Sequence, residues 1–484
     1  MKVLFSIFEA VPFIKTGGLG DIGGTLPKAL IKNGINMRVM LPKLQSIPQK
    51  YKDKMKKVSE FYFSLAWRNV YCGIEKLEHD GVIYYFIDNE HYFNRTKVYG
   101  YDDEGERMAY FSKATLEAIK HLDDFIPDVI NCNDWHTALI PVLLHEEYYN
   151  DPKYENIKTI FTIHNIKFQG IYAAGMISDV LGLEYKNRAI KRLTQDDKHI
   201  NFMKGALYYC DKITTVSPNY AKELCTKEYG EGLDWLFREK KDKLVGILNG
   251  INQHKISPSK DKYLECKYNT KSIKDKAHCK EELQRILGLT VNKKVPVIAI
   301  ISRLAKQKGF ELILEVFKEL MDEDIQFVVV GVGERKIEHD FYMYSLTYHD
   351  KFAFRNEFNQ EISSKVYAGA DMFLVPSEFE PCGLTRMMAM RYGAVAIVRE
   401  TGGLIDSLSP YNEYTDQGNG FSFTNFKAKE MLATIRYAVK IYNTKPKSWE
   451  KIVINGMKTN FSWSKSAKQY TELYEEVAVN ADVL

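Results

Sequence analysis

Short apolar runs that alternate with helix-like segments constrain the fold of this chain more than any other feature. The runs are almost continuously apolar, as in strands of a parallel sheet that crossover helices bury on both faces. Polar loops and helix-like stretches separate them, and the series restarts in the second half. The pattern therefore predicts an α/β fold with two doubly wound, Rossmann-like domains. The runs occupy residues 2–8, 35–42, 82–88, 128–134, 158–165, 212–218 and 244–250, then 295–304, 325–333, 351–356, 371–377 and 394–400.

The length of the chain, 484 residues, exceeds what a single ordinary core holds and also favours two domains. The first series of apolar runs ends at Asn249, and a polar, lysine-rich stretch follows soon after it. We expect the boundary there, with one domain over residues 1–249 and a second over residues 250–460. Residues 461–484 are expected to form a C-terminal helix that packs back on the first domain.

Composition narrows the class of protein. With 45% apolar and 27% charged residues the chain is typical of soluble globular proteins. Lysine and arginine number 67 against 63 acidic residues, a balance that favours neither nucleic acid nor a charged membrane surface. No stretch is long and apolar enough to span a bilayer, and acidic Glu9 argues against a signal peptide. Seven cysteines without a C-x-x-C pair suggest neither disulfides nor zinc, and fit a cytoplasmic location.

The segment KTGGLGDIGG, residues 15–24, contains the G-x-G-x-x-G pattern of dinucleotide-binding proteins. An NAD site needs that pattern directly after the first strand, and an acidic residue at the end of the second strand. Here a long loop precedes Gly17, and Lys43 follows the second strand. An NAD-dependent oxidoreductase is therefore the weaker alternative. The helix that begins in this loop still offers amides, beside the Lys15 ammonium, to a phosphate.

The second half has two further loops suited to anions. Arg303 and Lys308 follow an apolar run in SRLAKQKG, and two cations on one loop suit a diphosphate. Glu380 follows another run and precedes CGLT, where a helix is expected to begin and to present its amides. Ligands of open parallel sheets bind beyond the carboxyl ends of strands, where these residues and His164 are expected.

The motifs together resemble those of bacterial glycogen synthases and plant starch synthases, in the same order and over nearly the whole chain. The resemblance implies the GT-B fold, in which two Rossmann-like domains enclose a deep interdomain cleft. It also implies retaining transfer of glucose from a nucleoside-diphosphate glucose, ADP-glucose in most bacterial members. The acceptor would be the non-reducing end of an α-1,4-glucan. The segments are KTGGLGD, NDWHTALIP, TIHNIKFQG, NFMKGALYYCDKITTVSP, GILNGI, SRLAKQKG, FEPCGLTRMMAMRYG and RETGGLIDS.

The same resemblance assigns roles to individual residues. Catalytic roles, including contacts to the diphosphate, fall on Lys15, His164, Arg303, Lys308 and Glu380. Donor-binding roles fall on Gly18, Asn249, Phe358, Cys382, Gly383, Leu384 and Thr385, with Phe358 in place of a tyrosine that stacks near adenine. Roles on the sugar and acceptor side fall on Asp21, Tyr101 and Asp134.

The chain departs from the family pattern in places. Arg386 replaces a common glutamine, and we expect it either to change the hold on a donor phosphate or to face solvent. The segment GINQHK also differs at residues 252–254. His136 is expected to be a structural histidine with satisfied hydrogen bonds. A non-enzymatic glucan-binding protein on a decayed transferase fold is a further alternative, disfavoured because the cationic residues and Glu380 are all present.

We expect neither a metal nor another cofactor. The D-x-D motif at residues 322–324 precedes a strand and so falls at the amino end of the sheet, away from the site. Retention can arise from a carboxylate nucleophile or from attack by the acceptor on the face that the nucleotide leaves. We favour the second route, with the departing phosphate as base.

Overall fold

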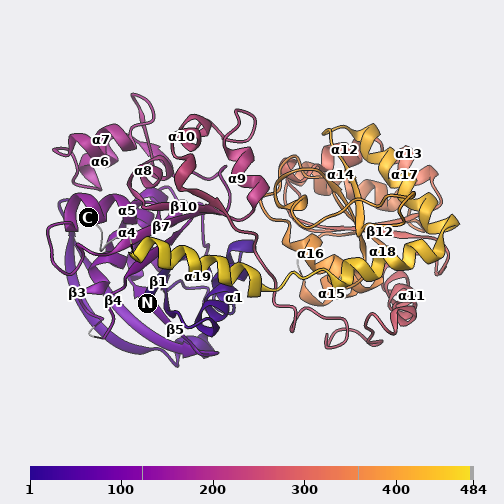
Figure 1. The fold of residues 1–484 in the computed structure, drawn as a ribbon, viewed down its shortest axis with the longest axis horizontal. Helices are drawn as coiled ribbons and strands as arrows, with labels where there is room; N and C mark the ends of the chain where they lie inside the picture. Colours follow the sequence, from indigo (N-terminus) through magenta and orange to yellow (C-terminus); the bar gives the residue numbers. More distant parts are fainter. Residues whose placement is uncertain (123, 358, 480–484) are drawn as a thin grey trace. The chain divides into compact units, whose positions relative to one another are not determined.

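The computed structural model describes residues 1–122, 124–357 and 359–479 of the chain. Its contacts separate the chain into two compact units. Unit 1 contains residues 1–249 together with the C-terminal helix from Trp463, and unit 2 contains residues 250–462. In each unit, helices flank a central sheet (Figure 1).

Within the described residues, the main sheet of unit 1 has nine strands in the order β11-β10-β7-β6-β1-β2-β5-β4-β3. Its central strands are parallel, and the interior of β1 is fully buried. The strands are β1 (Lys2–Ser6), β2 (Asn36–Pro42), β3 (Lys56–Leu65), β4 (Arg68–His79), β5 (Val82–Asp88), β6 (Val129–Asn133), β7 (Lys158–Ile163), β10 (Lys212–Thr215) and β11 (Leu244–Gly246), with a separate pair β8 (Ile171–Ala173) and β9 (His199–Asn201).

The hairpin of β3 and β4 is an addition that the apolar runs did not predict. Both strands pair antiparallel, and β4 joins them to β5 at one edge of the sheet. Strand β3 is largely exposed, because one face of an antiparallel edge can remain in water. The hairpin therefore lacks the continuous apolar sequence of the parallel strands.

Helices cover the unit 1 sheet and include the last helix of the chain. Helix α19 packs on α1 and on β6 (Figure 1). The buried Tyr474 hydroxyl of α19 donates to Asn131 Oδ1 at 2.7 Å, which ties the helix to the sheet. The helical segments, with short 3₁₀ or π turns labelled η, are α1 (Gly18–Lys32), α2 (Gln49–Lys52), α3 (Glu90–Phe93), α4 (Glu104–Ile119), η1 (Trp135–Thr137), α5 (Leu139–Leu143), η2 (Leu144–Tyr148), α6 (Met176–Asp179), α7 (Asn187–Leu193), α8 (Phe202–Tyr209), α9 (Pro218–Leu224), α10 (Asp234–Glu239), η3 (Lys241–Lys243) and α19 (Trp463–Val479).

Unit 2 has a six-stranded, wholly parallel sheet in the order β14-β13-β12-β15-β16-β17 within the described residues. Numbered within the unit, this is the order 3-2-1-4-5-6 of dinucleotide-binding Rossmann folds. The short strand β17 was not predicted. The strands are β12 (Val297–Ile301), β13 (Gln326–Val330), β14 (Phe352–Arg355), β15 (Met372–Val375), β16 (Val395–Arg399) and β17 (Gly420–Phe423). The helical segments are η4 (Ile273–Asp275), α11 (Lys276–Leu287), η5 (Lys306–Lys308), α12 (Phe310–Glu315), α13 (Phe317–Asp322), α14 (Arg335–Thr347), α15 (Gln360–Gly369), α16 (Leu384–Arg391), η6 (Gly402–Leu404), α17 (Ala428–Thr444) and α18 (Pro446–Lys458).

None of the helices in the described residues has the length and apolar character that crossing a membrane requires.

The glycines of α1 let the helix approach the loop that precedes it. A Cβ added at Gly23 would lie 2.3 Å from the Glu9 carbonyl oxygen and 2.9 Å from Ala10 Cβ. Glycine at this position of the G-x-G-x-x-G pattern therefore serves helix–loop packing. The same close approach brings the first turn of α1 to the end of the loop that carries Lys15.

We predict that Gly23→Ala destabilises the protein, because either the helix or the loop must shift. The expected loss is about 1–3 kcal/mol, as for other overpacked sites. Gly175→Ala is the matched control, since Gly175 has helical dihedrals and a Cβ there would meet nothing within 4 Å. The control is expected to change stability by less than about 0.5 kcal/mol. Equal thermal midpoints for the two variants would contradict the packing role of Gly23.

Candidate active site

The strand order reverses beside the first strand of each sheet, and candidate residues follow the strands on both sides of this reversal. In unit 1 the reversal lies between β1 and β6, whose following loops carry Lys15 and Asp134. In unit 2 it lies between β12 and β15, and the loops after them carry Lys308 and Glu380. Such reversals open a crevice at the carboxyl edge of a sheet, where ligands of doubly wound folds bind.

The buried Glu9 side chain holds the loop that carries Lys15 in place. The Glu9 carboxylate, only 2% exposed, accepts hydrogen bonds from Thr16 N at 2.5 Å and Thr16 Oγ1 at 2.6 Å. It also accepts a bond from the Tyr99 hydroxyl at 2.7 Å. A buried carboxylate with three donors holds its loop firmly. The sequence alone does not reveal this role, because its only signal is an acidic residue at the end of an apolar segment.

Lys15 and Asp21 form an ion pair at the start of α1. Lys15 Nζ lies 2.8 Å from Asp21 Oδ1. Burial raises the pKa of Asp21, and the nearby Lys15 ammonium opposes this rise. No side chain caps α1, whose N-cap residue is Gly17, so the Gly18 end of the helix keeps amides available for an anion.

Asp134 is held in a strained backbone conformation directly after β6. Its φ is 59°, a left-handed value that costs energy for a residue other than glycine. Its Oδ1 accepts hydrogen bonds from the backbone N–H groups of His164 at 3.1 Å and Asn165 at 3.4 Å. These hydrogen bonds lower the pKa of Asp134, but burial has the larger effect and raises it to about 7. The carboxyl can therefore gain or lose a proton near neutral pH.

The ring of His164 is neutral and has a defined tautomer. Desolvation lowers its pKa to about 3. Its Nε2 lies 3.0 Å from Asn133 Oδ1. Asn133 Nδ2 donates to the carbonyl oxygens of Ser6 and Asn131, which identifies Oδ1 as the atom that faces the histidine. His164 Nε2 therefore carries the hydrogen, and Nδ1 is left as an acceptor.

His136 does not match the expectation of a fully satisfied structural histidine. Its buried Nδ1 has no hydrogen-bond partner among the described residues. The ring stacks on Phe8 with centroids 5.2 Å apart, and burial lowers its pKa to about 3. Tyr99, the partner of Glu9, lies 5.3 Å from the same ring. His136 thus belongs to the cluster that supports the Lys15 loop.

Tyr101 lies close to two arginine side chains, and Asn249 is buried with an unpaired side-chain oxygen among the described residues. The Tyr101 ring has the guanidinium groups of Arg95 and Arg107 at 4.9 and 5.0 Å, and its backbone N–H donates to Glu104. Asn249 is buried, and its side-chain Oδ1 has no hydrogen-bond partner among the described residues. An unpaired buried amide oxygen is costly, and a ligand hydroxyl would satisfy it.

In unit 2, Lys308 and Glu380 form a close ion pair. Lys308 Nζ lies 2.6 Å from Glu380 Oε2, and the Ser377 hydroxyl donates to the same oxygen at 3.1 Å. With Thr385, these residues line a small hollow of about 10 Å³, roughly the space of one water molecule, between the ends of β12 and β15. Arg303, on the same loop as Lys308, is exposed; its carbonyl accepts from the Ala305 N–H at 3.0 Å, and its side chain makes no hydrogen bond or ion pair with a described residue.

Glu380 is positioned by a glycine turn after β16. The Gly403 N–H donates to the Glu380 carbonyl at 3.1 Å. A Cβ on Gly402 would lie 2.0 Å from that carbonyl oxygen, and Gly402 has a φ of 48°. Gly383, with a φ of 78°, is the N-cap of α16 and has no side-chain cap, which leaves the Leu384 and Thr385 amides available.

The burial of Arg386 contradicts one of the two expectations stated for it. The residue is fully buried, so it does not face solvent, and an effect on the hold of a donor phosphate stays a prediction. Its Nη2 donates to the Gly403 carbonyl at 3.1 Å and its Nη1 to Ser407 Oγ at 2.7 Å. Burial lowers the pKa of Arg386 to about 10. The side chain therefore joins α16 to the turn that supports Glu380.

Cys382, which is also predicted on the donor side, is buried beside the glycine turn that contains Gly403. A Cβ added at Gly403 would lie 2.7 Å from the Cys382 Cα. Phe358 lies outside the described residues. The described part of the chain contains no group of three His, Cys, Asp or Glu side chains suited to a metal ion.

We predict that the stability contribution of Asp134 depends on pH. Its folded pKa of about 7 exceeds the ordinary value of about 3.9, so folding favours the protonated form. Between these values the folded protein binds more protons, and stability falls as pH rises. The thermal midpoint of the wild type relative to Asp134→Asn should therefore drop by several degrees between pH 5 and pH 8. A pH-independent difference would show that Asp134 titrates normally.

Comparisons with known proteins identify the family of this chain. Residues 2–239 match the family Starch synthase catalytic domain, and residues 284–456 match the family Glycosyl transferases group 1. Glycogen synthases of Clostridium novyi and Anoxybacillus flavithermus are both 48% identical to this chain, with 99% and 100% of it covered and 99% of each relative.

The catalytic domain of starch synthase IV from Arabidopsis thaliana, solved with ADP and acarbose, is similar at a TM-score of 0.90 and 31% identity. The match covers 99% of both chains. Sucrose-phosphate synthase from Thermosynechococcus elongatus, at 15% identity, a TM-score of 0.64 and 99% coverage of both chains, shares the fold. The chain thus belongs to the glycogen synthase and starch synthase family of glycosyltransferases, with two Rossmann-like domains of the GT-B type.

Proposed function

We propose that this chain transfers glucose from ADP-glucose to the non-reducing end of an α-1,4-glucan, with retention, and so elongates glycogen. The Lys308–Glu380 pair at the strand reversal of unit 2, 2.6 Å apart, is the observation that carries the proposal. It places a cation and a carboxylate where a diphosphate and its sugar would meet. The ADP in the Arabidopsis starch synthase structure supports adenine as the base of the donor.

Cationic groups and helix amides would stabilise the leaving diphosphate. Lys308 and Arg303 follow β12, and the uncapped start of α16 adds its amides. Lys15 and the start of α1 would supply the contribution of unit 1. The proposal assigns both groups of residues to the same donor.

Unit 1 would contact the sugar with neutral polar groups. His164 is uncharged, with Nδ1 free to accept, and the unpaired Asn249 Oδ1 can accept from a hydroxyl. Asp134, Asp21 and Tyr101 complete the sugar and acceptor side. Such contacts would orient a glucosyl group.

The transfer would proceed on one face of the sugar. The bond from the anomeric carbon to the diphosphate oxygen breaks, and the acceptor 4-hydroxyl oxygen bonds to the same carbon. The hydroxyl proton passes to the departing diphosphate. Glu380 would bind a glucose hydroxyl and favour positive charge on the ring, since Lys308 and Ser377 already orient its carboxylate.

The chemical partners of the proposal are ADP-glucose and the glucan, with no metal, membrane or nucleic acid. A cytoplasmic location is part of it, supported by seven free cysteine thiols. An oxidoreductase is not retained, because Lys43 at the end of β2 is paired with Glu75 and Asp88 where an NAD site needs a free carboxylate.

The direct test supplies radiolabelled ADP-glucose or UDP-glucose with glycogen as primer. We expect incorporation into glycogen from ADP-glucose, and the same rate in EDTA. No incorporation from either donor would overturn the proposed function. Activity lost in EDTA and restored by magnesium would overturn its metal-free form alone.

We predict that Lys308→Ala lowers kcat about a hundredfold, because a contact to the developing diphosphate charge is worth roughly 3 kcal/mol. Lys306→Ala is the matched control. Lys306 lies on the same loop, and its ammonium makes no ion pair with a described residue. Both variants are compared at equal amounts of folded protein. Equal losses in the two would contradict the role assigned to Lys308.

A further inference from the structure

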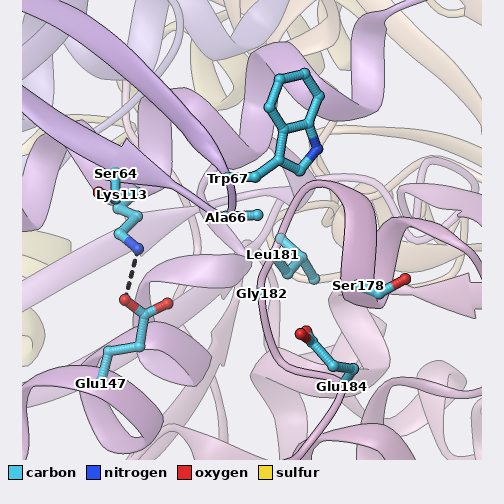
Figure 2. Close-up of a pocket in the computed structure, with 9 residues that line it drawn as sticks. All are labelled: Ser64, Ala66, Trp67, Lys113, Glu147, Ser178, Leu181, Gly182 and Glu184. Atoms are coloured by element: carbon cyan, nitrogen blue, oxygen red, sulfur yellow. Dashed lines mark hydrogen bonds and ion pairs between the residues drawn. The ribbon is translucent and has the colours of Figure 1, made fainter.

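A second pocket lies in unit 1, at the tip of the β3–β4 hairpin, and shares no residue with the candidate site. Its volume of about 340 Å³ is within the range of small-ligand pockets. In Figure 2, Lys113 and Glu147 lie on one side, Ser178 and Glu184 on the other, and Trp67 above them. The lining residues are Ser64, Ala66, Trp67, Lys113, Glu147, Ser178, Leu181, Gly182 and Glu184.

Trp67 is exposed and yet held in place. Its side chain is 74% exposed, whereas tryptophan is usually well buried. The indole Nε1 donates to Asp179 Oδ1 at 2.8 Å, and the Arg68 guanidinium lies 4.4 Å from the ring centroid. Arg68 itself pairs with Asp179 at 3.0 Å and with Glu106 at 3.2 Å. An aromatic ring fixed in this way loses little entropy when a ligand stacks on it.

The backbone conformation around the pocket also lets the hairpin tip and the loop after α6 approach each other closely. Ala66, at the hairpin tip, has a φ of 50° and Gly182 a φ of 65°. A Cβ on Gly182 would lie 3.3 Å from Ala66 Cα. Glycine therefore allows the loop after α6 to close against the hairpin, which defines the shape of the pocket.

The charges of the pocket disfavour an anionic ligand. Lys113, only 7% exposed, is paired with Glu147 at 2.5 Å, and Arg68 is neutralised by two carboxylates. The exposed Glu184 makes no ion pair with a described residue. Carboxylates and serine hydroxyls instead suit a neutral ligand rich in hydroxyl groups. The indole face suits the C–H face of a pyranose ring, because its π electrons attract the partly positive hydrogens.

We propose that this pocket binds a segment of α-1,4-glucan, separately from the transfer site. The proposal rests on the proposed function, which makes the glucan the polymer that this chain meets. A polymer held at the pocket keeps its other chain ends at a high effective concentration near the enzyme. Only long or branched glucans gain from this, since a short acceptor cannot occupy both sites at once.

The test compares glycogen with maltotriose as acceptors for the full-length enzyme, at saturating ADP-glucose. Trp67→Ala is expected to raise the KM for glycogen roughly five- to tenfold, as for loss of an aromatic anchor, and to leave kcat and the KM for maltotriose unchanged. Trp67→Phe keeps an aromatic face and should retain most of the glycogen affinity. Trp235→Ala, at another exposed tryptophan (43%) on α10, is the matched control and should match the wild type.

Retardation in native gels that contain glycogen, without donor, measures binding independently of transfer. If the wild type transfers no glucose but its retardation depends on Trp67, the proposed function fails and the pocket assignment holds. An unchanged glycogen KM and unchanged retardation in Trp67→Ala would overturn the assignment, as would equal effects on both acceptors. If Trp67→Ala does not fold, Glu184→Ala decides: wild-type glycogen affinity in that variant overturns the assignment, and weakened affinity for glycogen alone supports it.

Discussion

The reversal of strand order beside the first strand of each sheet is the constraint on which the functional architecture depends. At β1 and β6, and again at β12 and β15, neighbouring strands send their connections to opposite faces of the sheet. The loops therefore part and leave an opening at the carboxyl edge. Lys15, Asp134, Lys308 and Glu380 all occupy these loops, although they are far apart in the sequence.

The two openings differ in their electrostatics. In unit 1 the buried groups tend toward neutrality: His136 and His164 have lowered pKa values, and the pKa of Asp134 is raised to about 7. In unit 2 a charged pair, Lys308 and Glu380, occupies the corresponding place. Unit 1 also has a charged pair, Lys15 and Asp21, whose Nζ and Oδ1 atoms are 2.8 Å apart, so the opening of each unit contains a cation, and unit 1 adds the neutral histidines.

Buried charged residues hold in place the loops that carry the candidate site residues. Glu9 holds the Lys15 loop through three hydrogen bonds, and Arg386 holds the glycine turn that carries the Glu380 backbone. Both are charged groups buried in the fold, where losing one partner costs far more than at the surface. The β3–β4 hairpin lies outside the parallel core, and it adds the surface on which Trp67 is displayed.

The sequence by itself determined the fold class and predicted which loops follow the strands at the candidate site. Continuous apolar runs require burial on both faces, and the loops after them carry motifs such as SRLAKQKG and FEPCGLT whose spacing is local. It could not determine the half-exposed hairpin of β3 and β4, since an edge hairpin needs no continuous apolar run.

Only the tertiary structure decided which side chains meet. Burial of Arg386 and Glu9 depends on segments distant in the chain, as does the fixed, exposed ring of Trp67. The same holds for His136 Nδ1, which has no hydrogen-bond partner in the described part of the chain. The physical reason is that the residues packed around a side chain set its pKa, exposure and hydrogen bonding. The sequence, in contrast, directly gives the type of each residue and its position after a strand.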